Sequence, residues 1–222
     1  MQQNKKAVLF DLDGTLLDTL PDLTASLAHA LAANGFPVHG ESEVRCMIGD
    51  GIHTLVTRAL PRDAGADSVL RVLADFRADY AENCTKHTRA YPGAAKMLSA
   101  LRLAGVSAAV VTNKDDGAAN RIISRYFPGG VDITRGVREA SERKPDARVT
   151  LRVLSRLGVS AENAVFVGDG KNDFLVAGNA GITFVPVGYG YTDPPELESI
   201  CKIAPARDIS GLFAMIKNRL GE

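Results

Sequence analysis

The stretch AVLFDLDGTLLDT, Ala7 to Thr19, decides the fold prediction. Its first four residues, Ala7 to Phe10, are all apolar and show no helical period. A short, uninterrupted apolar run is typical of a strand buried on both faces of a parallel sheet. The run therefore predicts a central strand with Asp11 near its end.

Two carboxylates follow this predicted strand. If the extended conformation continues through Leu12, the two-residue period of a strand points Asp11 and Asp13 to the same side, and Gly14 then lets the chain turn. Like charges at that spacing raise one pKa or bind a cation, so the pair suggests proton transfer, a metal site or both. The alternative is an Asp-Gly turn with solvated acids and a helix that begins at Thr15.

The composition favours a small-molecule partner. The 222 residues suffice for one sizeable hydrophobic core and a smaller second one. Lys and Arg total 26, as do Asp and Glu, so the chain lacks the basic excess of nucleic-acid-binding proteins. Three widely spaced cysteines fit a reducing compartment. Without an apolar segment of membrane-spanning length or a signal-peptide core, we expect a cytoplasmic protein with no membrane partner.

Strand-like and helix-like patterns alternate along most of the chain. Helical spacing of apolar residues at Ala94 to Ala104 and at Val149 to Leu157 stops at a glycine in each case. Further apolar runs predict strands at Ala108 to Val111, Val131 to Thr134, Ala164 to Val167 and Ile182 to Val187. This alternation predicts an α/β fold with a doubly wound parallel sheet.

One region contains helical patterns alone. It begins after the first strand with Pro21 in a first helical turn and an apolar series that ends before Gly35. Further helices are expected at Val44 to Ile48, Ile52 to Leu60 and Val69 to Tyr80. We therefore predict a core domain of residues 1–17 and 89–222, with a small helical cap domain of residues 18–88 inserted after the first strand.

Polar residues that could bind a ligand or take part in catalysis follow the predicted strands. In open α/β sheets, ligands bind outside the carboxyl ends of the strands. Thr112 and Asn113 follow one predicted strand, Lys144 lies in a loop after another, and Asp169 and Asp173 follow a third. Each alone reads as a cap, a turn or a solvated charge, but several carboxylates with one hydroxyl and one lysine suit Mg²⁺ and a phosphate.

The ordered segments DLDGT, VVTN, RKPD and VGDGKND resemble the four motifs of the haloacid dehalogenase superfamily. The segment MIGDGIHTLVTRAL in the helical region is similar to the phosphoglycolate phosphatase group within it. The resemblance implies a Rossmann-like core. It also implies that Asp11 attacks phosphorus to form an aspartyl phosphate, while Asp13 acts as general acid and base.

The same resemblance implies the remaining site residues. Mg²⁺ would be held by Asp11, Asp169, the backbone carbonyl of Asp13 and, directly or through water, Asp173. Thr112 and the amide of Asn113 would bind the transferring oxygens, and Lys144 would offset charge on nucleophile and phosphoryl group. In the cap, the resemblance implies substrate contacts from a glycine-rich turn and two side chains: Gly49, Asp50, Gly51, Arg45 and His53.

The sequence thus predicts a Mg²⁺-dependent phosphatase of a small phosphorylated metabolite, with 2-phosphoglycolate as the candidate substrate. A sugar-phosphate mutase of the β-phosphoglucomutase type would share every core residue, although no mutase cap signature is present. A phospho-receiver or other non-catalytic binding protein would leave Asp13 and the cap unexplained, and a dehalogenase would need neither Asp13 nor a metal. Monomer and homodimer both stay open.

Overall fold

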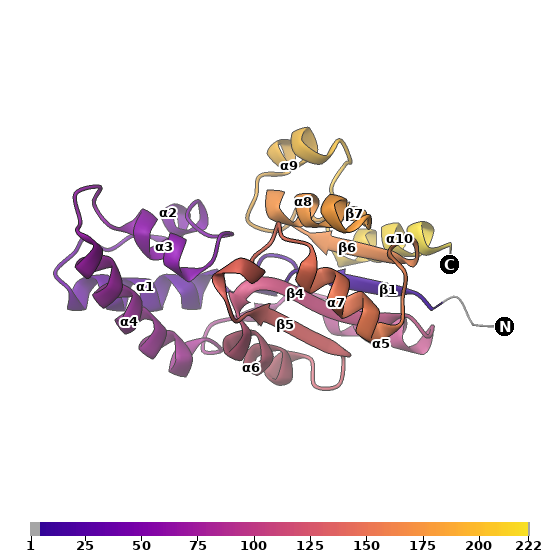
Figure 1. Cartoon of the computed structure of the whole chain (residues 1–222), viewed down its shortest axis with the longest axis horizontal. Coiled ribbons are helices and arrows are strands. Elements are labelled where there is room, and N and C mark those ends of the chain that lie inside the picture. The colour runs from indigo at the N-terminus through magenta and orange to yellow at the C-terminus, as the bar shows by residue number, and fades with distance from the viewer. Residues whose placement is uncertain (1–4, 222) are drawn as a thin grey trace. The chain divides into compact units, whose positions relative to one another are not determined.

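The computed structural model of the chain describes residues 5–221, which divide into two compact units. One unit joins the residues up to Leu17 to those from Ala90 onwards, and the other spans Asp18–Arg89. Figure 1 labels most elements of the two units, numbered in chain order. The first unit alternates strands with helices, whereas α-helices make up most of the second.

A five-stranded parallel sheet forms the centre of the first unit. β1 is its middle strand, and Val8 lies opposite Ala108 on one side and Val165 on the other. All four β1 residues are fully buried, as the apolar run predicts. The spatial order is β5-β4-β1-β6-β7, with β1 at Ala7–Phe10, β4 at Ser107–Asp115, β5 at Ile133–Val137, β6 at Ala164–Gly168 and β7 at Thr183–Pro186.

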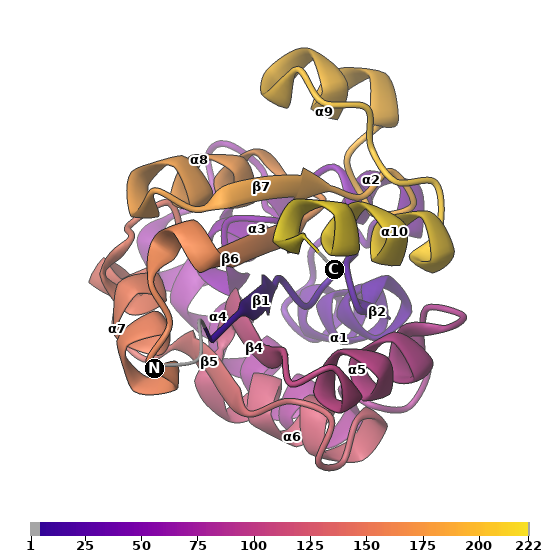
Figure 2. The same cartoon turned by 90° about the vertical axis from the view of Figure 1, so that its right-hand side faces the viewer.

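Helices cover both faces of this sheet, which confirms the predicted doubly wound α/β class. In Figure 2, α7 and α8 lie on one side of the strands, and α5, α6 and α10 lie on the other. The bounds are α5 Ala94–Leu103, α6 Asp116–Tyr126, α7 Arg148–Leu157, α8 Lys171–Ala180, α9 Pro194–Cys201 and α10 Ile209–Leu220, with 3-10 turns η1 Ala140–Glu142 and η2 Ala161–Asn163.

Two strands differ from their predicted bounds by more than one residue at an end. β4 continues past the expected end at Val111 as far as Asp115, and β5 lies at Ile133–Val137 instead of starting at Val131. Three of the extra β4 residues, Thr112, Asn113 and Lys114, are polar yet buried, and the register of β4 against β5 shifts between Val111 and Asp115. Hydropathy alone misses such a segment, because polar side chains stay buried only where other groups bind them.

The second unit consists of four α-helices and the ends of two short strands. α1 (Leu20–Ala33) and α4 (Ala66–Asn83) pack along each other, and α3 spans Ile52–Ala59. α2 lies at Glu41–Arg45, earlier than the predicted Val44 to Ile48, because Gly40 caps it and donates its N–H to Glu43 Oε2 at 2.9 Å. β2 (Leu17–Asp18) and β3 (Arg89–Ala90) pair with each other where the chain passes between the units.

A buried aspartate in α1 holds the segment through which the chain leaves the second unit. Asp22 accepts hydrogen bonds from the backbone N–H groups of His87 and Thr88, at 2.8 Å each. Asp22 is 1% exposed, so these bonds satisfy a carboxylate that would be costly to bury alone.

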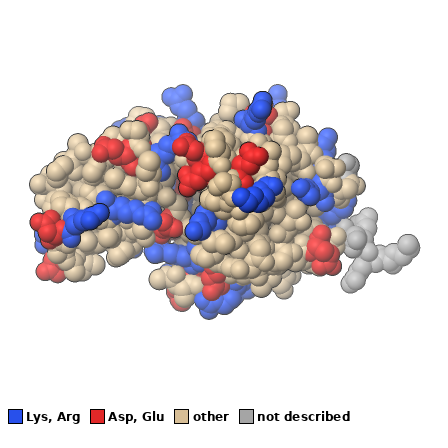
Figure 3. Space-filling model, turned by 90° about the horizontal axis from the view of Figure 1, so that it is seen from above, with Lys and Arg blue, Asp and Glu red and all other residues tan. Residues whose placement is uncertain are grey.

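The described surface carries no continuous basic area on the face drawn in Figure 3, where Lys and Arg are interspersed with Asp and Glu. This mixture agrees with equal totals of 26 basic and 26 acidic residues. Within residues 5–221, no helix combines the length and the apolar character needed to cross a bilayer.

Candidate active site

Three predicted acids converge at the carboxyl ends of β1 and β6. Asp11 directly follows β1, and its N–H donates to Val167 O at 2.9 Å, extending the contact between the two strands. Asp169 directly follows β6, and Asp173 lies in the first turn of α8. One carboxylate oxygen from each of the three lies within 4.8 Å of the others. Adjacent parallel strands therefore bring Asp11 close to two acids that are 158 and 162 positions away in the sequence.

Asp169 is fixed by neighbours that lie far away in the sequence. Thr15 Oγ1 donates to Asp169 Oδ1 at 3.1 Å, and the backbone N–H of Tyr191 donates to Asp169 Oδ2 at 2.7 Å. Gly14 has a φ of +77°, and a Cβ there would come within 2.8 Å of Asp169 Cγ. Position 14 thus needs glycine for both its backbone conformation and the close approach of the carboxylate.

The charge around Asp169 and Asp173 is not balanced by these neighbours. Burial, together with the nearby Asp173 and Asp11 carboxylates, raises the pKa of Asp169 to about 8. Burial also raises the pKa of Asp173 to about 6, although Lys144 opposes the change. Both groups are 5% exposed or less. The site therefore holds more negative charge than its own donors can stabilise.

Lys144 lies between two of the acids. Its Nζ is 2.8 Å from Asp11 Oδ1 and 2.6 Å from Asp173 Oδ1. Burial by itself would lower the pKa of Lys144, but the two carboxylates outweigh it and raise the pKa above its ordinary value. Lys144 is therefore a permanent ammonium, as its predicted role requires.

Asn113 makes a contact that the sequence did not predict. Its side-chain Oδ1 accepts from the N–H of Lys144 at 2.7 Å, and its Nδ2 donates to the O of Lys144 at 3.3 Å. The Asn113 side chain thus binds the backbone of Lys144, whereas the family resemblance implies only that the amide of Asn113 binds a phosphoryl oxygen. Thr112, 4% exposed, precedes it in β4, and Thr112 Oγ1 accepts the N–H of Lys114 at 3.3 Å.

Lys114 was not singled out from the sequence, and it pairs with Asp13. Its Nζ lies 2.8 Å from Asp13 Oδ1 and 3.1 Å from Asp13 Oδ2, and its side chain is 3% exposed. The available signal was a lysine directly after Thr112 and Asn113. Hydropathy placed the end of the strand before these residues and gave no reason to expect Lys114 to be buried.

The site as a whole has a formal excess of negative charge. Two ammonium groups, Lys114 and Lys144, face four carboxylates, which leaves two negative charges unmatched. Asp11 Oδ1 is buried and, within the described residues, receives no hydrogen bond of good geometry besides its ion pair with Lys144. This charge and this acceptor are complementary to a divalent cation with oxygen ligands.

Comparison with known proteins identifies the family. The model of the haloacid dehalogenase-like hydrolases matches residues 8–187. The chain belongs to this family. Among its relatives, a phosphoglycolate phosphatase of Rhodospirillum rubrum is 36% identical over 93% of this chain and 89% of its own length. An N-acetylmuramic acid 6-phosphate phosphatase of Pseudomonas aeruginosa is 34% identical over 86% of this chain and 85% of its own.

A solved structure agrees with this assignment. The crystal structure of a candidate phosphoglycolate phosphatase from Lactobacillus delbrueckii subsp. bulgaricus superposes with a TM-score of 0.91. It is 29% identical in sequence, and the match covers 99% of this chain and 100% of that one. The similarity to a haloacid dehalogenase-like hydrolase thus extends over both units.

The predicted cap residues of this hydrolase all lie in the second unit. Gly49 and Gly51 have φ values of 113° and 84°, so the turn between α2 and α3 depends on glycine at both positions. Asp50, between them, pairs with Arg58 Nη2 at 2.5 Å. Arg45 ends α2, and His53 is exposed in the first turn of α3. The substrate contacts expected of these five residues stay predictions.

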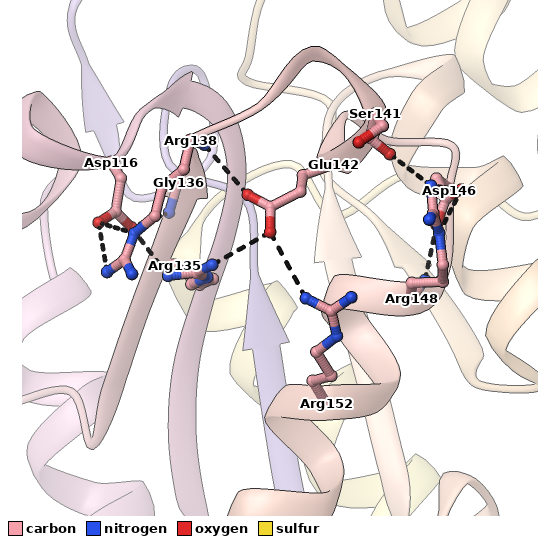
Figure 4. Close-up of polar contacts among 9 residues, drawn as sticks. All are labelled: Asp116, Arg135, Gly136, Arg138, Ser141, Glu142, Asp146, Arg148 and Arg152. Carbon is pink, nitrogen blue, oxygen red and sulfur yellow. Dashed lines mark hydrogen bonds and ion pairs between the residues drawn. The ribbon is translucent and has the colours of Figure 1, made fainter.

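A network of charged side chains anchors the loop that carries Lys144. Glu142 Oε1 accepts from Arg135 Nη2 at 3.2 Å, and Glu142 Oε2 accepts from the backbone N–H of Arg138 at 3.1 Å (Figure 4). Arg152 of α7 also pairs with Glu142, at 3.5 Å. Asp116 accepts from the N–H of Gly136 at 3.0 Å and from Arg138 Nε at 2.8 Å. Hydrogen bonds and ion pairs therefore connect the loop to β5, α6 and α7.

Proposed function

We propose that the chain is a Mg²⁺-dependent phosphatase that hydrolyses a small phosphorylated metabolite through an aspartyl phosphate, with 2-phosphoglycolate as the candidate substrate. One observation carries the proposal: Asp11 and Asp13 are paired with different lysines, Lys144 and Lys114. Two neighbouring acids in separate environments suit two separate chemical roles. Hydrolysis of a phosphoric monoester is also the reaction named for relatives that are 36% and 34% identical.

The donor set fits Mg²⁺. Asp11 and Asp169, the backbone carbonyl of Asp13, and Asp173 would hold the ion, which when bound would screen the acids from an approaching phosphate dianion. The pKa of Asp169, raised to about 8 by burial and by the neighbouring acids, supports this assignment because a bound cation would compensate the buried negative charge. The oxygen of Asp11 that lacks a well-directed hydrogen bond offers a further ligand.

Asp11 would act as the nucleophile in the first step. Its free carboxylate oxygen would attack phosphorus while the bond from phosphorus to the leaving-group oxygen breaks. Asp13, in its acid form, would transfer its proton to the departing alkoxide. The products of this step are the free alcohol, an aspartyl phosphate on Asp11 and the carboxylate of Asp13.

Asp13 would act as the base in the second step. Its carboxylate would take a proton from a water molecule as that water attacks the phosphorus of the aspartyl phosphate, which releases inorganic phosphate and restores Asp11. Throughout, Lys144 would neutralise charge on Asp11 and on the phosphoryl group, and Thr112 would donate to a phosphoryl oxygen. The clamp between Asn113 and the Lys144 backbone supports the fixed position that this role needs.

A hydrolysis screen over phosphorylated metabolites tests the proposal. We expect release of phosphate from 2-phosphoglycolate in Mg²⁺, loss of activity in EDTA, and inhibition by Ca²⁺, whose looser coordination lets a carboxylate bind through both oxygens. Phosphate release should be assayed with each metabolite at equal concentration and with each metal in excess. Full activity in EDTA would contradict the metal assignment, and no hydrolysis of any phosphate ester would contradict the phosphatase proposal.

A further inference from the structure

We infer that Lys114 is a positioning residue that holds the carboxylate of Asp13 in place for proton transfer. The inference rests on the proposed function, since Asp13 transfers protons only if the chain hydrolyses a phosphate ester. Lys114 Nζ contacts both oxygens of Asp13, at 2.8 and 3.1 Å. A cation that contacts both oxygens restricts the rotation of a short side chain, because any rotation lengthens at least one contact.

Lys114 is itself held firmly. Its side chain is 3% exposed, and its N–H donates to Thr112 Oγ1 at 3.3 Å. The backbone of β5 lies directly against it, since a Cβ on Gly136 would come within 2.5 Å of Lys114 O. An ammonium buried this deeply requires a counter-charge, and Asp13 provides it. Lys114 is therefore a rigid support for a partner that is more exposed.

Asp13, unlike Lys114, is partly exposed to solvent. Its side chain is 23% exposed, against 3% for Lys114, so part of the carboxylate can be reached by a leaving group. Its backbone forms an isolated bridge with Leu17, and the N–H of Gly14 donates to Leu17 O at 2.9 Å. Lys114 occupies only part of the acceptor capacity of the two Asp13 oxygens, and the exposed part of the carboxylate can still carry and transfer the proton.

Two neighbouring residues of β4, Asn113 and Lys114, thereby hold Lys144 and Asp13 in place beside Asp11. Asn113 forms hydrogen bonds with the backbone of Lys144, and Lys114 forms an ion pair with the carboxylate of Asp13. Asn113 and Lys114 both lie where the register of β4 against β5 shifts, between Val111 and Asp115. This irregular end of β4 fixes the distance between the charge that stabilises the phosphoryl group and the acid that serves the leaving group.

A double-mutant cycle on the full chain tests whether Lys114 acts through Asp13. The variants are Lys114→Met, Asp13→Asn and the double variant, with Lys96→Met as the control because Lys96 is exposed on α5. Each is assayed in Mg²⁺ on 2-phosphoglycolate and on p-nitrophenyl phosphate. A protonated leaving group matters most for the alkyl ester, so a displaced acid should affect that substrate more.

We expect Lys114→Met to lower kcat on 2-phosphoglycolate by about 10- to 100-fold, with a smaller loss on p-nitrophenyl phosphate, because a displaced catalytic group costs rate more than binding. KM should change by less than about threefold. In the Asp13→Asn background, Lys114→Met should cause no further loss. Lys96→Met should match the wild type in both kcat and KM.

Three results would overturn the inference: equal losses on both substrates, a large rise in KM, or an undiminished effect of Lys114→Met in the Asp13→Asn background. If Lys114→Met does not fold, as judged by circular dichroism, Lys114→Gln faces the same criteria, since it retains an N–H donor without the charge. Wild-type protein that hydrolyses neither of these esters nor any other phosphate ester would overturn the proposed function and this inference together. Active wild type with unaffected Lys114 variants would overturn only the inference.

Discussion

Asp11 and Asp13 are two positions apart, yet their contacts divide them chemically. Asp11 follows a fully buried strand and pairs with Lys144, which also pairs with Asp173. Asp13 lies beyond the strand and pairs with Lys114. A nucleophile must stay ionised, whereas a general acid must exchange its proton, so the two roles require different partners. The structure thus gives each of the two acids a lysine partner of its own.

Substitution of each acid by its amide should separate the two roles. Asp11→Asn should abolish formation of the aspartyl phosphate, because a neutral amide is a poor nucleophile. Asp13→Asn should leave the backbone carbonyl in place and lower turnover of an alkyl phosphate by about 10²–10⁴-fold. Acid quench of each variant with a substrate carrying radioactive phosphorus measures the label bound to protein. Wild-type turnover of an alkyl phosphate by Asp13→Asn would show that Asp13 is merely structural.

At the scale of elements, the loop between β5 and α7 has to deliver Lys144 to a site formed by other strands. Glu142 precedes the lysine and receives two arginines and a backbone N–H, while Asp146 follows it and accepts from Arg148 Nε at 2.9 Å (Figure 4). The side chain of Glu142 is 13% exposed. This network is partly shielded from water and binds both ends of the loop. It should therefore contribute more to the free energy of unfolding than an isolated surface ion pair does.

Glu142→Ala should loosen this loop and displace Lys144. We expect kcat to fall by about 10-fold, since displacement of a catalytic group by a fraction of an ångström is costly, and Tm to fall by about 2–4 °C. Steady-state kinetics and calorimetry measure the two effects. Glu139→Ala is the matched control, because Glu139 is an exposed acid in the same loop. Equal kcat for Glu142→Ala and Glu139→Ala would show that the network does not position Lys144.

The sequence correctly predicted the elements whose side chains are buried because they are apolar. The run from Ala7 to Phe10 is the middle strand, and the acids expected at the ends of β1 and β6 lie together. It missed the burial of Asn113 and the role of Lys114, because these polar groups are buried through contacts with Lys144 and Asp13, which are distant in the sequence. Periodicity reports solvent exposure and carries no information on which polar group binds which.

At the scale of the whole molecule, the charge excess of the site links stability to pH. The pKa values of Asp169 and Asp173, about 8 and about 6, both exceed the value of roughly 4 expected for Asp in an unfolded chain. The folded protein without metal therefore binds more protons than the unfolded chain across this window. By linkage, the stability that these two groups contribute is fully present below about pH 4 and falls as pH rises towards 8. Lys144, whose pKa is raised, stays charged throughout and adds no slope there.

Mg²⁺ should reverse this loss of stability, and more strongly at high pH. The ion binds carboxylates after their protons have left, so the increase in Tm on adding Mg²⁺ should be small at pH 5 and reach about 5–10 °C at pH 8 with the ion at about 100 times its Kd. Calorimetry in EDTA and in MgCl₂ at the two pH values measures the difference. Asp169→Asn removes the charge with little change in volume, so it should stabilise the protein in EDTA at pH 8 and lose most of the response to Mg²⁺. A response to Mg²⁺ that is the same at pH 5 and pH 8, or that survives in Asp169→Asn, would mean that the ion binds elsewhere on the chain.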